Sequence, residues 1–151
     1  MFSQLFGKYL IESDIISEEQ YEDILAKVEK TRAKLGLIAV SEGILTKEKA
    51  ERINILQTQK DARFGDIAVE EGYITKEQLD MILSKQASPY IKFIQVLEEV
   101  TGIKQDKIEL YIEDFRKSIG FTFDELESLK SEDIDSIVPM FFHLSHQHYL
   151  P

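Results

Sequence analysis

Two stretches that repeat one another decide the fold: LGLIAVSEGILTKEKAERINILQ at residues 35–57 and FGDIAVEEGYITKEQLDMILSKQ at residues 64–86. Both begin with an apolar residue and glycine, continue through Glu-Gly to Thr-Lys-Glu, and end on glutamine. Equivalent residues lie 29 positions apart, as Gly36 and Gly65 do. A fixed period of this length is typical of repeat proteins, in which each repeat is one small supersecondary unit.

The register of 29 residues extends in both directions from this pair. Gly7 lies 29 residues before Gly36, and Ile94 lies 29 residues after Gly65. Three apolar columns then run through four copies: Tyr9, Ile38, Ile67 and Val96; Ile16, Leu45, Ile74 and Ile103; and Ile24, Ile53, Ile82 and Tyr111. The sequence therefore predicts a continuous tandem array of four 29-residue repeats, of which the fourth is degenerate because it has lost the glycine.

Each copy is expected to hold a short first helix and a longer second helix. Leu79, Ile82 and Leu83 follow the i, i+3, i+4 spacing of one helix face. The hydroxyl residues that can cap the second helices are Ser17, Thr46 and Thr75. The glycines placed to end the first helices in a left-handed conformation are Gly43 and Gly72. Since no segment alternates as a strand does, the predicted fold class is all-α.

The pattern changes after the third copy. Ser88-Pro89 opens the degenerate copy, because the residue before proline disfavours helix. Thr122 and Glu125 fit a capping box for a helix that runs to about Lys130. One more helix is expected over residues 131–142, so one or two C-terminal helices follow the eight of the repeats. The predicted domains are residues 1–86, with three repeats, residues 87–115, with the degenerate repeat, and residues 116–151, with the C-terminal helices and tail.

The N-terminal turn carries Phe2, Leu5 and Phe6 at i, i+3, i+4 spacing. Solenoid-like arrays present apolar surface at uncapped ends. If this turn does not fold back onto its own core, we expect Phe2 and Phe6 to form a homodimer or partner contact.

Composition excludes several classes of protein. The 151 residues carry a net charge of −10, which argues against a broad nucleic-acid surface. No apolar run approaches the roughly 20 residues of a membrane span, and the N-terminal residues lack the pattern of a signal peptide. We therefore expect a cytoplasmic protein with no membrane insertion. Residues 27–63 nevertheless hold nine Lys/Arg and five Asp/Glu, which fits either chance clustering or a local site for a small anion.

No catalytic or metal site is predicted. The chain has no cysteine, and its three histidines all lie in the tail, at His143, His146 and His148. A short histidine tract without acidic or cysteine partners nearby is weak support for a metal site. Because no acid, base or nucleophile is assembled, the sequence predicts a protein that is not an enzyme and has no cofactor.

The second and third copies share polar features that the first lacks. They begin on cations, Lys34 and Arg63, keep both glycines, and end their second helices on Gln57 and Gln86. A cation, a glycine that permits close backbone approach and a planar amide can together bind a heterocycle with phosphate. The alternative is that glutamine ends an exposed helix and glycine relieves helix crowding.

Residues 34–86 resemble the N-terminal domain of type II secretion and type IV pilus assembly ATPases. One branch of that family binds cyclic di-GMP through two tandem 24-residue motifs of the form R-L-G-x-x-L and L-x-x-x-L-x-x-Q, joined by five residues. Here residues 34–57 and 63–86 have that length and spacing, although Lys34, Ala39 and Ala68 depart from the motif. The resemblance implies two groups of ligand-binding residues: Lys34, Leu35 and Gly36 with Gln57 at one guanine, and Arg63, Phe64 and Gly65 with Gln86 at the other.

A second likeness is to helical segments that precede CheX-like chemotaxis phosphatase domains, through the repeat start and residues 132–138. It implies an adaptor of a signalling protein. Two functions therefore stay open: a regulatory module that binds a cyclic dinucleotide, and a protein-interaction adaptor in a chemotaxis, secretion or pilus system that binds no small ligand and contacts a partner or itself.

Overall fold

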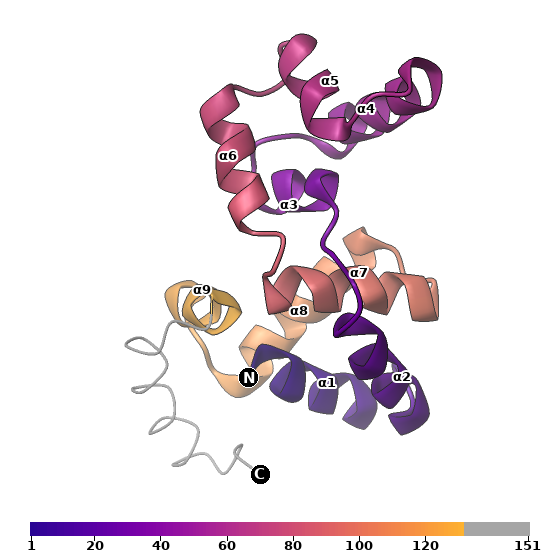
Figure 1. Cartoon of the computed structure of the whole chain (residues 1–151). Helices are drawn as coiled ribbons and strands as arrows, with labels where there is room; N and C mark the ends of the chain where they lie inside the picture. Colours follow the sequence, from indigo (N-terminus) through magenta and orange to yellow (C-terminus); the bar gives the residue numbers. More distant parts are fainter. Residues whose placement is uncertain (132–151) are drawn as a thin grey trace. The chain divides into compact units, whose positions relative to one another are not determined.

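The computed structural model describes residues 1–131, and its regular structure there is helical, with nine helices and no strand (Figure 1). The all-α fold class is confirmed. The helices are α1 (Phe2–Glu12), α2 (Glu18–Val28), α3 (Leu35–Ser41), α4 (Lys47–Lys60), α5 (Phe64–Glu70), α6 (Lys76–Ser84), α7 (Pro89–Thr101), α8 (Gln105–Ile119) and α9 (Phe123–Ser131). The helix expected over 131–142, the histidine tail and the stretch 132–138 lie outside the described residues. Within residues 1–131, no helix is long and apolar enough to cross a membrane.

The helices gather into two compact units. Among the described residues, one holds residues 1–30 together with residues 96–131, and the other holds residues 31–95. Helices α3 to α6 belong to the second unit, and α7 passes from it into the first between residues 95 and 96. The division places the first and last helices of the predicted array in one unit and its middle pair in the other. The continuous array is therefore not confirmed.

The local signals in the sequence set the helix starts. Ser17 and Thr75 form capping boxes, in which the hydroxyl accepts from the third helical N–H and a glutamine side chain accepts from the cap's own N–H. Thr46 accepts from the Lys49 N–H, and Thr122 forms a third box with Glu125. The first helices end before glycines with positive φ, Gly43 at 73° and Gly72 at 76°.

The ends of the two middle second helices differ from those expected. Both helices were expected to end on a glutamine, but α4 continues through Lys60 and α6 stops at Ser84. Helix α4 ends where Asp61 takes the left-handed conformation, with its N–H bonded to the Gln57 carbonyl. Gln57 therefore lies inside its helix and Gln86 lies beyond the end of its own.

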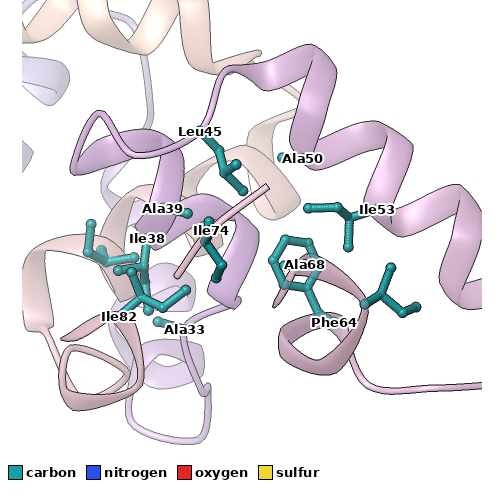
Figure 2. Packing of buried hydrophobic residues seen from close by; sticks show 12 residues of the cluster. Ala33, Ile38, Ala39, Leu45, Ala50, Ile53, Phe64, Ala68, Ile74 and Ile82 are labelled. Atoms are coloured by element: carbon teal, nitrogen blue, oxygen red, sulfur yellow. The ribbon is translucent and has the colours of Figure 1, made fainter. Parts of the chain in front are cut away.

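The predicted apolar columns supply the core of the 31–95 unit. Ile38, Ile53, Ile67 and Ile82 are fully buried, and Figure 2 shows Ile38 and Ile82 turned toward a common interior with Ile74. The small residues Ala39 and Ala68 fill equivalent places in the two copies. Burying four isoleucines stabilises the unit by about 1.5–3 kcal/mol for each side chain. Packing of this core therefore positions helices α3 to α6, which carry the candidate polar residues at their ends.

The N-terminal aromatic turn folds back onto its own chain. The exposed fractions of Phe2 and Phe6 are 1% and 0%. Their rings lie against Phe115 of α8, with centroids 6.1 and 5.4 Å from its ring. We expected an intermolecular contact through Phe2 and Phe6 only if this turn did not fold back onto its own core. It does fold back, so that expectation is corrected. The i, i+3, i+4 spacing marked a buried face, whose partner is supplied by a helix distant in the sequence.

Candidate functional site

The second and third copies are interleaved. Helix α3 packs against α6, and α4 packs against α5, so the first helix of each copy meets the second helix of the other. The two first helices, α3 and α5, also contact each other. Such an arrangement is reciprocal, as in a contact between two equivalent partners. It brings the start of each 24-residue motif beside the end of the other.

The two glutamines make the same hydrogen bond in reciprocal places. Gln57 Nε2 donates to the Ala62 carbonyl at 3.4 Å, and Gln86 Nε2 donates to the Ala33 carbonyl at 3.3 Å. Ala33 and Ala62 are equivalent residues that directly precede Lys34 and Arg63. The structure therefore joins Gln57 to the start of the Arg63 motif and Gln86 to the start of the Lys34 motif. The family resemblance had implied the opposite grouping of cations and amides.

The glycines lie where helices approach closely. A Cβ at Gly36 would be 3.2 Å from the Phe64 ring, and one at Gly65 would be 2.7 Å from Leu79 Cδ1. These contacts favour the alternative role of the glycines, which is relief of helix crowding. They also have a consequence for the site: because Gly36 lies against Phe64, the two motif starts are neighbours. Leu35 is half-buried, and Phe64 is buried.

The two candidate cations lie at the starts of the first helices of the two copies. Lys34 and Arg63 are the N-cap residues of α3 and α5, and both are exposed. Arg32, which the repeat comparison did not single out, donates to Gln86 Oε1 at 2.9 Å. Its equivalent in the next copy is Asp61, so the 29-residue comparison gave no signal for it. The two motif starts therefore differ in charge.

Gln95 is the second residue that the repeat comparison missed. It is 6% exposed, and its amide binds the segment before α3 on both sides. Gln95 Oε1 accepts from the Lys34 N–H at 2.8 Å, and Gln95 Nε2 donates to the Arg32 carbonyl at 3.2 Å. A signal was present, because Gln95 is one polar residue within the apolar run Phe93-Ile94-Gln95-Val96-Leu97.

Two ion pairs repeat the crossed pattern. Lys60 of α4 lies 2.8 Å from Glu71 at the end of α5, and Lys85 at the end of α6 lies 2.7 Å from Glu42 at the end of α3. The hydrogen bond with the Glu71 carboxylate raises the pKa of Lys60. Exposed pairs of this kind contribute little to stability. The pairs show the same crossed arrangement, because Glu42 and Glu71 are equivalent residues and each pairs with a lysine at the end of the other copy's second helix.

The region presents polar groups that can form hydrogen bonds and ion pairs. It offers exposed cations, planar amides and backbone groups. In the part of the chain that the structure describes, no three His, Cys, Asp or Glu residues are grouped to hold a metal ion. Comparison with protein-family models, curated proteins and solved structures found no match.

Proposed function

We propose that the 31–95 unit is a non-catalytic regulatory module that binds a cyclic dinucleotide, with cyclic di-GMP as the first candidate. The reciprocal arrangement of the two motifs carries the proposal. A cyclic dinucleotide has two nucleotide halves joined in a ring, so it can present the same groups twice to a protein surface built twice. The resemblance to the tandem-motif family points to the same ligand.

The charge of the unit is suited to an anion with two phosphodiesters. Residues 31–95 hold ten Lys/Arg and nine Asp/Glu, whereas the rest of the chain holds eight and nineteen. Within the unit, Arg32 and Lys34 stand beside one glutamine and Arg63 stands beside the other. Charge-assisted hydrogen bonds to phosphate are the stronger kind, and a guanidinium can make two of them in parallel.

The two glutamine amides still have hydrogen-bonding groups with which they can bind a nucleotide base. Each Nε2 carries two hydrogens, one of which is used on an alanine carbonyl, and each Oε1 has two lone pairs, one of which accepts from Arg32 at Gln86. A donor and an acceptor on one planar group match the edge of a purine. The amides are held in place by those alanine carbonyls, so a ligand would meet a site that is already oriented.

Isothermal titration of the whole protein with cyclic di-GMP tests the proposal. We expect binding of the cyclic ligand and weaker binding of its linear, ring-opened dinucleotide, which pays more conformational entropy. Arg63→Ala and Gln86→Ala should each reduce affinity about tenfold or more, since each loses contacts worth about 1.4 kcal/mol. The matched control is Arg52→Ala, which removes an exposed arginine of α4.

The result that removes the proposed site is equal affinity in the parent, Arg63→Ala and Gln86→Ala. Circular dichroism of each variant should show an unchanged helical signal, because both side chains project from the ends of elements rather than from the core. A loss of helix in either variant would make its titration a test of folding, and the other variant then decides.

The alternative, a protein-interaction adaptor, has a weaker basis. Each second helix shows one exposed aliphatic side chain: Leu25, Ile55, Leu83 and Leu110. Single exposed apolar residues are ordinary on protein surfaces and do not define a docking site. The crossed polar arrangement favours the ligand-binding function.

A further inference from the structure

We propose that Gln95 is a positioning residue for one half of the ligand site, and this inference rests on the proposed function. We call Arg32, Lys34 and Gln86 the Lys34 half, and Arg63 with Gln57 the Arg63 half. Gln95 belongs to α7, which lies outside both 24-residue motifs. It acts through the backbone of the segment 32–34.

The hydrogen bonds of Gln95 fix that segment from within the protein. Among the described residues that are buried, Gln95 is the one polar side chain, and both ends of its amide are used. Gln86 also binds Ala33 twice, through its side-chain Nε2 and through its backbone carbonyl, which accepts from the Ala33 N–H at 3.3 Å. The backbone that carries Arg32 and Lys34 is thus held by hydrogen bonds from two glutamines.

The Arg63 half is held differently. Its equivalent segment, residues 61–63, is bound by Gln57 at 3.4 Å and by the left-handed end of α4. The two halves therefore resemble each other in their glutamines and differ in Gln95. This asymmetry predicts that Gln95 affects the ligand contacts of Arg32 and Lys34 and leaves those of Arg63 unchanged.

The physical reason is pre-organisation. A segment whose backbone is already fixed loses less conformational freedom when its side chains bind a ligand. The amide of Gln95 accepts from the Lys34 N–H through its oxygen and donates to the Arg32 carbonyl through its nitrogen. Gln95→Met keeps the length of the side chain and removes both hydrogen bonds, and Gln95→Glu keeps the acceptor alone.

A double-mutant cycle with cyclic di-GMP tests the inference on the whole protein. Gln95→Met should weaken binding about tenfold, as expected for the loss of two ordinary hydrogen bonds. Added to the double substitution Arg32→Ala, Lys34→Ala, it should weaken binding little further, because both side chains that it positions are gone. Added to Arg63→Ala, it should weaken binding by the full factor again. Gln59→Met, at an exposed position of α4, is the matched control and should bind as the parent does.

A second measurement needs no ligand. The amide proton of Lys34 should exchange with solvent about tenfold faster in Gln95→Met than in the parent, and in Gln95→Glu it should stay protected, because the carboxylate still accepts from it. If Gln95→Met does not fold, Gln95→Glu carries the same double-mutant cycle with a smaller loss of affinity.

The outcomes separate the two proposals. A loss that multiplies fully both with the double substitution Arg32→Ala, Lys34→Ala and with Arg63→Ala indicates a general effect on folding and overturns the role of Gln95, while the ligand site stands. Unchanged affinity in Gln95→Met overturns it as well. A parent protein that binds no cyclic dinucleotide overturns both the function and this inference.

Discussion

At the scale of single residues, the glycines show how one sequence signal can serve two purposes. Gly36 and Gly65 were singled out because they can admit a ligand, yet the structure places a neighbouring side chain over each. Gly7, their equivalent in the first copy, lies under the Tyr21 ring. A helical glycine costs roughly 0.5–1 kcal/mol relative to alanine, which close packing of this kind offsets. The shared column is therefore explained by packing in all three copies.

Gly7→Ala tests this packing role. Its Cβ would lie 2.1 Å from Tyr21 Cε1, so the ring must move and lose the hydrogen bond from its hydroxyl to the Ser3 carbonyl. We expect a loss of about 1–3 kcal/mol in the free energy of unfolding, measured by urea denaturation. Gly65→Ala should cost less, because the atom in its way is the end of the flexible Leu79 side chain. An unfolding free energy at or above that of the parent in Gly7→Ala would contradict the packing role.

The sequence identified six of the eight candidate residues by type alone, through cations, glycines and glutamines that recur at 29 residues. Leu35 and Phe64 entered through the family resemblance. What the sequence could not show is which cation meets which amide, because spacing along the chain does not say whether Gln57 folds back to its own motif or across to the next. Arg32 and Gln95 were missed for a related reason. The equivalent position in the third copy holds a different residue type, Asp61 for Arg32 and Asp66 for Gln95, so a comparison between copies passes over them.

At the scale of elements, helix starts were predictable and some helix ends were not. A capping box involves residues three apart, so Ser17 and Thr75 could be recognised directly. The end of α4 depends on Asp61 adopting a left-handed conformation, with a φ of 48°. Aspartate does so less often than glycine, and its cost is offset here by the hydrogen bond from its N–H to the Gln57 carbonyl. That balance cannot be read from the local sequence.

Helix α4 offers a stabilising change. Thr46 caps it, but Lys49 stands where α2 and α6 have the reciprocal glutamine. Lys49→Gln should complete the box and remove a cation from the positive end of the helix, raising the unfolding free energy by about 0.5–1 kcal/mol. In a Thr46→Ala background the gain should largely vanish, because the box then has one partner. Thermal and urea denaturation of the four proteins decide the point, and the same gain in both backgrounds would refute the completed box.

At the scale of the whole molecule, the 29-residue register relates equivalent residues along the sequence, but it does not predict which helices group together. The apolar columns indicate that each copy has a face to bury, and one of the three columns is fully buried at Ile24, Ile53 and Ile82. They do not say which copy covers which face, because the faces resemble one another. The choice depends on connections and on aromatic partners such as Phe115, which lies outside the apolar columns.

Two compact units imply two regions that open separately. Ile53 lies in the 31–95 unit, and Ile24 is its equivalent in the other unit; both are fully buried. Truncating either to alanine removes the same atoms from the same repeat position and should cost about 2–5 kcal/mol where the cavity forms. Stability differs between regions of a protein, and hydrogen exchange reports each region by itself.

We therefore expect Ile53→Ala to speed amide exchange in α3 to α6 while α1, α2 and α8 keep the exchange of the parent, and Ile24→Ala to do the reverse. Peptide-level exchange followed by mass spectrometry measures both variants against the parent under one set of conditions. The comparison is matched because the two isoleucines occupy one column of the repeat. If either variant accelerates exchange uniformly through residues 1–131, the molecule opens as a single cooperative body, and the two units are divisions of its contacts rather than of its stability.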